Sequence, residues 1–214
     1  MTELLTPMTS YEWHVTIFFT AAGYLCGSFL SAYFLPLWLC HVDVTDGTRD
    51  KNPGAANAFM KAGIPCGILV LLCELGKGAL PVLAAAKYLP ITRPGFFLIM
   101  LAPVIGHGWS CFYGGSGGKA IAVSFGVLIG LLPEMRPRAL LIFFYLFFSL
   151  ILKIPSHSRR TVVTFTCWLG SMCFLLHQPV LLAGCFGIAA IVIYKHMRAS
   201  HLEQQARAPE EKTV

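Results

Sequence analysis

The sequence predicts an all-α integral membrane protein of about seven transmembrane helices, with its N-terminus outside and its C-terminus in the cytoplasm. Three observations favour this fold class: apolar residues are abundant, polar residues lie in short stretches, and basic residues gather in alternate loops. Hydrophobic residues make up 56% of the 214 positions and charged residues 12%, whereas an average soluble domain carries about 25% charged residues. The mean hydropathy is +0.69. We therefore expect one membrane domain over residues 1–214.

Apolar runs between charges and turn residues indicate the spanning helices. A span needs about 20 mostly apolar residues, because only internally paired backbone is tolerated in hydrocarbon. The expected spans cover residues 13–39, 64–86, 95–112, 121–132, 139–152, 162–176 and 180–194. No Lys or Arg precedes Arg49, so the first run should stay as a span and not be cleaved as a signal peptide. Residues 199–214 are polar, and we expect a mobile cytoplasmic tail there.

The orientation follows from the basic residues of the short loops. With the N-terminus outside, the cytoplasmic loops and tail hold eleven lysines and arginines and the outer loops hold four. The cytoplasmic residues are Arg49, Lys51, Lys61, Lys119, Lys153, Arg159, Arg160, Lys195, Arg198, Arg207 and Lys212, and the outer ones are Lys87, Arg93, Arg136 and Arg138. The net charge of +6 is therefore a topology signal for the lipid bilayer, and no nucleic-acid partner is expected. The eight cysteines show no Cys-x-x-Cys pair and no zinc spacing, so no metal or cofactor is expected.

Residues 42–59 form the first unusual polar stretch on the predicted cytoplasmic face. Asn52-Pro53-Gly54 is a turn signal, and small residues and a helix follow it. A turn that leads into a helix N-terminus presents unpaired backbone N–H groups, which suit a phosphate. An ordinary turn between helices is the alternative.

A glycine-rich stretch is the second feature of that face. Gly106-His107 is followed by residues 114–119, which read Gly-Gly-Ser-Gly-Gly-Lys. Successive glycines let the backbone form a concave anion site, and a lysine at its end adds a positive charge. The stretch is not a nucleotide-binding P-loop, because Tyr113 and Ala120 replace the first glycine and the magnesium-binding hydroxyl of that motif. A flexible loop between spans is the alternative.

Two charged residues, Glu74 and Lys77, lie inside the second predicted span. Residues three apart share one helix face and can pair, and charges at membrane depth usually face a bundle interior or a polar cavity. A structural ion pair, a ligand contact and the ion path of a transporter all fit this pattern. Residues 156–160 and 194–196 are further polar clusters that fit interfacial anchors.

Taken in this order, the segments resemble the bacterial acyl-phosphate:glycerol-3-phosphate acyltransferases, the PlsY family, from about Gly23 to His196. The motifs that carry the resemblance are Leu25–Ser28, Asp50–Asn57, Lys77–Pro81 preceded by Glu74, Gly106-His107 with Gly117–Ala120, and Tyr194–His196. The sequence departs from the family pattern at Asp50, Lys51, Met60, Ser116 and Ala199, which replace a serine, a glycine, an arginine, a lysine and an asparagine.

The resemblance implies an enzyme of the plasma membrane that transfers a fatty acyl group from acyl phosphate to the 1-hydroxyl of glycerol 3-phosphate, giving lysophosphatidic acid for phospholipid biosynthesis. It implies no cofactor, and an enzyme that forms acyl phosphate as an upstream functional partner. It assigns catalysis to Lys119 and His107, with His107 orienting the loop or relaying a proton. The substrate-binding residues that it implies are Asp50, Asn52, Gly54, Ala55, Asn57, Lys77, Gly117, Gly118, Ser156, Ser158 and His196.

Two other functions stay open at the level of sequence. The replacements at Asp50, Met60 and Ala199 suit a diverged, non-catalytic relative that binds acyl phosphate or lysolipid. Glu74 and Lys77 suit a small membrane transporter. Turnover would indicate the enzyme, tight substrate binding without turnover the non-catalytic relative, and uptake into liposomes the transporter.

Overall fold

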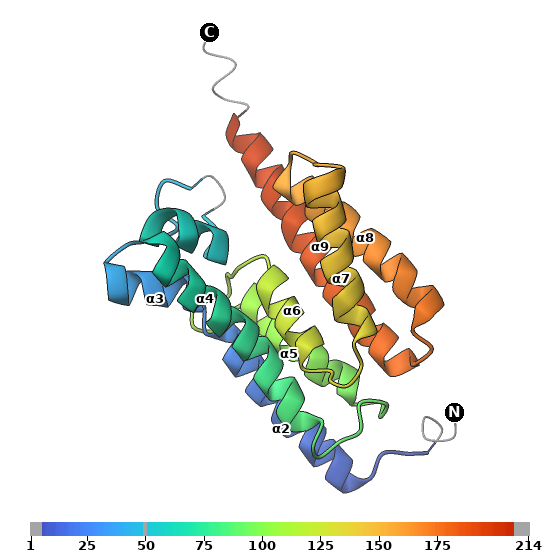
Figure 1. Cartoon of the computed structure of the whole chain (residues 1–214). Coiled ribbons are helices and arrows are strands. Elements are labelled where there is room, and N and C mark those ends of the chain that lie inside the picture. The colour runs from blue at the N-terminus through green and yellow to red at the C-terminus, as the bar shows by residue number, and fades with distance from the viewer. Residues whose placement is uncertain (1–5, 49–50, 208–214) are drawn as a thin grey trace.

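The protein is described by a computed structural model that covers residues 6–48 and 51–207. Throughout this part of the chain the regular elements are helices, which confirms the all-α prediction. They are α2 (Ser10–Ser28), α3 (Ser31–Cys40), α4 (Ala55–Ala85), α5 (Phe96–Gly108), α6 (Ile121–Ile129), α7 (Arg136–Leu146), the π-helix η1 (Phe147–Ile151), α8 (His157–Leu175) and α9 (Pro179–Arg207). In Figure 1, α2–α4 lie on one side, α7–α9 on the other, and α5 and α6 between them.

The first apolar run, predicted as one span over residues 13–39, is a pair of helices bent by 43°. Phe29 and Leu30 leave the helical region, with ψ angles of 103° and 80°. Runs of apolar residues do not reveal such a break, because its cause lies in contacts with α4 that are described below.

Three further helices depart from the predicted bounds. Helix α8 begins at His157, ahead of the predicted start at residue 162. Helix α4 begins at Ala55, ahead of the predicted start at residue 64, and changes direction at Gly63, whose φ is 83°. Helix α9 continues to Arg207, so residues 199–207 of the predicted polar tail are helical. Ala, Leu, Glu, Gln and Arg are good helix formers, and they extend the helix begun in the apolar segment. Residues 208–214 lie outside the described residues.

Two described helices are long and apolar enough to cross a membrane by themselves, α4 and residues 179–202 of α9. The bent pair α2–α3 makes a third if it is counted as one span. Helix α5 is a shorter apolar helix.

Close crossings between helices fix the position of the polar end of the bundle. Gly78 of α4 and Gly126 of α6 lie where a Cβ would meet the backbone of the other helix. Small residues at such crossings let helix backbones approach closely in a membrane. Because α6 packs against α4 in this way, the loop that precedes α6 is held beside the polar end of α4.

Candidate functional site

A cavity of about 460 Å³ lies between the start of α4, the loop before α6 and the start of α8. The turn before α4 and the first residues of α4 contribute Asn52, Gly54, Ala55 and Asn57 to its lining. Lys119, from the loop before α6, lines the same cavity. The two phosphate-suited loops predicted from the sequence therefore meet in one cavity.

A second cavity, of about 310 Å³, adjoins the first and shares Asn52 and Lys119 with it. Lys51, Lys195 and Arg198 also line the second cavity. Four cationic side chains around one small space attract an anion, and neighbouring cations make a doubly charged phosphate a better fit than a monoanion.

The turn before α4 is held by its own polar groups. The Asn57 side-chain amide donates to the Asn52 carbonyl oxygen at 2.9 Å, and the Gly54 N–H donates to the same oxygen at 2.9 Å. Gly54 is the N-cap of α4 with extended backbone angles. Because a glycine offers no capping side chain, the first N–H groups of α4 can donate to a bound anion.

The glycine loop is packed against the end of α5. The Gly118 N–H donates to the His107 carbonyl oxygen at 3.0 Å. A Cβ at Gly117 would overlap that carbonyl, and a Cβ at Gly118 would overlap the His107 ring. His107 is 4% exposed and lines the larger cavity beneath Lys119. The histidine therefore supports the loop that carries the lysine, which fits the predicted orienting role.

Glu74 and Lys77 of α4 and His107 of α5 form a buried charged cluster, of which Glu74 and His107 line the larger cavity. The Lys77 Nζ lies 2.9 Å from the Glu74 Oε1, and the His107 Nδ1 lies 3.0 Å from the Glu74 Oε2. The Lys77 Nζ also lies 3.0 Å from the His107 Nδ1. Glu74 is 1% exposed, so the pairing offsets a large desolvation cost.

The same cluster accounts for the break between α2 and α3. Lys77 donates to the Phe29 carbonyl oxygen at 2.7 Å, at the C-terminal end of α2. The Ser31 hydroxyl, in the first turn of α3, donates to Glu74 at 2.6 Å. A cation therefore lies at the negative end of one helix dipole and an anion at the positive end of the next, which is the favourable arrangement.

Lys77 consequently has a different environment from the predicted phosphate contact. Its ammonium is engaged by Glu74, His107 and the end of α2, and it lies outside the lining of both cavities. Among the predicted site residues, Gly117 lines the second cavity, whereas Gly118 packs on His107.

The remaining predicted residues have mixed positions. Ser156 is the N-cap of α8, and its hydroxyl accepts a backbone N–H of the first turn. Ser158 is buried outside the lining of both cavities. His196 is fully buried, with its ring 5.5 Å from the ring of His157, which lines the larger cavity. Asp50 lies outside the described residues.

Sequence reasoning did not select His157, Lys195 or Arg198 as ligand-contacting residues. Lys195 and Arg198 are three positions apart on α9, a spacing that places both on one helix face and could have marked them. Lys195 is held in place because it donates to the Gly108 carbonyl and lies 4.8 Å from the centre of the Trp109 ring. Within the described residues, no group of three or more His, Cys, Asp or Glu side chains is placed to hold a metal ion.

These features define a helical membrane protein with two adjoining anion-suited cavities at one end of its bundle. Comparison with known proteins agrees with this class. The model of the family described as glycerol-3-phosphate acyltransferase matches residues 17–202. The chain therefore belongs to the glycerol-3-phosphate acyltransferase family, as the motifs predicted, and it is a membrane-bound acyltransferase.

Individual relatives cover most of the chain. A glycerol-3-phosphate acyltransferase of Geobacter metallireducens is 33% identical over 85% of this chain and 90% of its own length. One of Fusobacterium nucleatum is 29% identical over 83% of this chain and 89% of its own length. One of Myxococcus xanthus is 38% identical over 58% of this chain, and that match spans 65% of the relative.

Solved structures share the fold. Two crystal structures of PlsY, described as an integral membrane glycerol 3-phosphate acyltransferase, cover 90% of this chain and 93% of their own. The lysophosphatidic acid form has a TM-score of 0.74 at 24% identity, and the glycerol 3-phosphate form 0.75 at 25% identity.

Proposed function

We propose that this protein transfers a fatty acyl group from acyl phosphate to the 1-hydroxyl of glycerol 3-phosphate, giving lysophosphatidic acid for phospholipid biosynthesis. The observation that carries the proposal is the pair of adjoining cavities that share Lys119 and Asn52. A reaction between two phosphorylated substrates needs two anion sites in contact, and the family membership supplies the class of reaction.

In this proposal the larger cavity takes acyl phosphate. Met60, Leu71 and Ile121 give it apolar walls that suit the start of an acyl chain. The N–H groups at the start of α4, with Asn57, hold the phosphate. The smaller cavity takes glycerol 3-phosphate, with its phosphate held by Lys51, Lys195 and Arg198.

The reaction then needs no covalent enzyme intermediate. The hydroxyl oxygen of glycerol 3-phosphate attacks the acyl carbonyl carbon, a new C–O ester bond forms, and the bond to the phosphate oxygen breaks. The electron pair leaves with phosphate, which accepts the hydroxyl proton as it departs. Lys119, between the cavities, stabilises negative charge on the leaving phosphate, and positioning supplies much of the remaining rate.

We further propose seven spans, an outer N-terminus and a cytoplasmic C-terminus in the plasma membrane. The support is the clustering of basic residues at the cavity end of the bundle, where the start of α8 and the end of α9 lie near each other (Figure 1) and Lys51 and Lys119 line the cavities. A cytoplasmic site also suits a soluble substrate such as glycerol 3-phosphate and an upstream enzyme that forms acyl phosphate.

The test is release of phosphate and formation of lysophosphatidic acid by purified protein given palmitoyl phosphate and glycerol 3-phosphate. Lys119→Ala should lower the rate by at least 100-fold, because a charge-stabilising donor is lost at the leaving group. Arg159→Met, which removes an exposed cation outside both cavities, is the matched control and should retain the wild-type rate.

The other functions give different results in the same preparation. A non-catalytic relative would bind acyl phosphate tightly and release no phosphate. A transporter would move substrate into liposomes, and uptake would depend on both Glu74 and Lys77. The engagement of Lys77 by the end of α2 favours the enzyme over the transporter.

A further inference from the structure

We propose that His157 is a substrate-contacting residue that donates a hydrogen bond from Nε2 to an oxygen of bound acyl phosphate, and that Arg160 positions it. This inference rests on the proposed function and adds a residue outside the family motifs identified above. It concerns the start of α8, the side of the larger cavity that faces α4.

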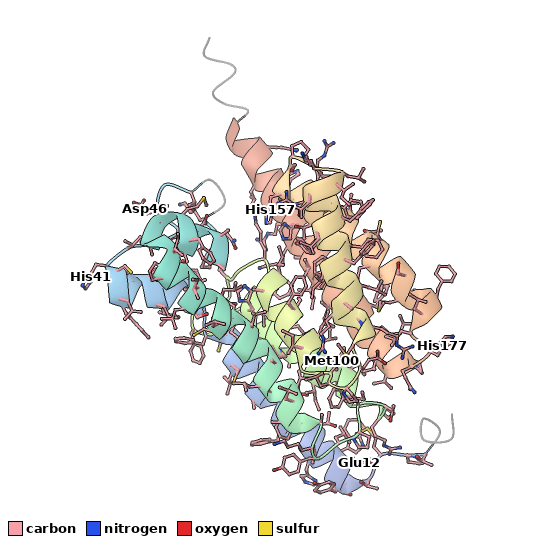
Figure 2. All side chains as sticks on the ribbon, viewed as in Figure 1. Glu12, His41, Asp46, Met100, His157 and His177 are labelled. Atoms are coloured by element: carbon pink, nitrogen blue, oxygen red, sulfur yellow. The ribbon has the colours of Figure 1, made fainter. Side chains whose placement is uncertain are left out.

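His157 is the first residue of α8 and lines the larger cavity together with Lys119 and the start of α4. Figure 2 shows it where the helices α7–α9 face α4. The residue therefore reaches the space between the two sides of the bundle, opposite the N–H groups proposed to hold the phosphate of acyl phosphate.

Arg160 and His196 both contact the ring of His157. The Arg160 Nη2 lies 3.2 Å from the His157 Nδ1, and the Arg160 Nη1 donates to the Ile154 carbonyl oxygen at 3.4 Å. The ring of His196 packs against it edge to face, at 5.5 Å between centroids and 68° between planes. Because His196 is fully buried, it provides a fixed surface for the His157 ring.

The contact with Arg160 determines the tautomer of His157. A guanidinium group carries only hydrogen-bond donors and stays protonated. The Nδ1 atom of His157 must therefore accept, which requires a lone pair at that nitrogen. A neutral imidazole that accepts at Nδ1 carries its proton at Nε2 and donates there. Arg160 thus makes His157 a donor at the nitrogen that is turned away from the guanidinium.

A donor on this wall suits the proposed reaction. Acyl phosphate presents only oxygen acceptors near its reactive carbon, and negative charge grows on the carbonyl oxygen during attack and on the leaving phosphate afterwards. A pre-positioned N–H group that meets such an oxygen typically contributes about 100-fold or more to the rate. His157 would complement Lys119, which lines the same cavity.

Amide substitutions at His157 distinguish the effect of its hydrogen-bond donor from the effect of the size of its ring. Gln places an amide near the position of Nε2, whereas Asn places one near Nδ1. His157→Gln should keep kcat/KM for palmitoyl phosphate within about 5-fold of wild type, while His157→Asn and His157→Ala should lose about 100-fold. Equal losses in Gln and Asn, or wild-type rates in all three, would overturn the contact.

The role of Arg160 is tested by a double-substitution cycle. Arg160→Met should lower kcat/KM about 10-fold in the wild-type background, and Arg159→Met, one position away, should not. In the His157→Gln background Arg160→Met should have no further effect, because the amide needs no tautomer to be set. A purely structural role of Arg160 would give the same loss in both backgrounds and would refute positioning.

A binding measurement keeps this inference separate from the proposed function. A non-hydrolysable acyl phosphonate should raise the thermal unfolding temperature of the wild type and His157→Gln in detergent, and raise that of His157→Asn much less. If the wild type released no phosphate, the proposed function would fail, and this protection pattern alone would decide whether His157 contacts the acyl phosphate. Equal protection of all variants would refute the contact.

Discussion

Gly118 leaves no room for a side chain, because a Cβ there would overlap the imidazole ring of His107. Gly118→Ala should therefore displace the loop that carries Lys119 and lower the acyl-transfer rate about 100-fold. Gly76→Ala is the matched control, because a Cβ at Gly76 meets nothing within 4 Å and alanine favours a helix. Initial rates of phosphate release give the comparison, and a fully active Gly118→Ala protein would show that the loop tolerates this displacement.

Sequence motifs located the residues of the candidate site that act through backbone geometry and spacing along the chain. The turn at Asn52 and Gly54 and the lysine after the glycines needed only local signals, and both line the larger cavity. The position of Lys77 could not be predicted in this way, because its partner is the Phe29 carbonyl, 48 residues away in the chain. His157 was missed because its significance depends on which cavity α8 faces.

At the scale of elements, the break between α2 and α3 depends on the charges of α4. Lys77→Met would leave the Glu74 carboxylate buried without its ammonium partner and the end of α2 without its cation. Loss of one member of a buried ion pair costs about 3–5 kcal/mol, so the thermal unfolding temperature in detergent should fall sharply. The double variant Glu74→Gln/Lys77→Met removes both charges and should unfold at a higher temperature than Lys77→Met alone. The reverse order would mean that the ion pair does not stabilise the break.

Helix bounds were predictable only where the apolar pattern itself changes. The run at residues 121–132 corresponds to α6, because Lys119 and Pro133 limit it, and the run at residues 162–176 predicted the end of α8 but not its start at His157, which lies beyond Arg159 and Arg160. The bend at Gly63 and the polar extension of α9 to Arg207 leave no trace in an average hydropathy. Both follow from backbone conformation and helix propensity, which a search for apolar runs does not read.

At the scale of the whole molecule, the proposed orientation places the two cavities in the cytoplasm and the turn between α8 and α9 outside. Helix α8 has 19 residues and is therefore about 28 Å long at 1.5 Å per residue, close to the roughly 30 Å of a bilayer core. His157 and His177 lie at its two ends (Figure 2). Cys111, in the loop before α6, is exposed at the cavity end.

Cysteine labelling in intact cells tests this orientation. In a background whose other cysteines are replaced, an impermeant maleimide should label His177→Cys without permeabilisation and should label Cys111 only after it. Both proteins must first pass the phosphate-release assay, which shows that the replacements preserve the fold. Labelling of Cys111 in intact cells would reverse the orientation, and the cavities would then open away from the compartment that holds glycerol 3-phosphate. Labelling of neither site before permeabilisation would contradict the crossing of α8. The predicted labelling pattern requires that the basic residues at the cavity end lie in the cytoplasm. The larger number of lysines and arginines in these loops than in the outer loops favours that orientation.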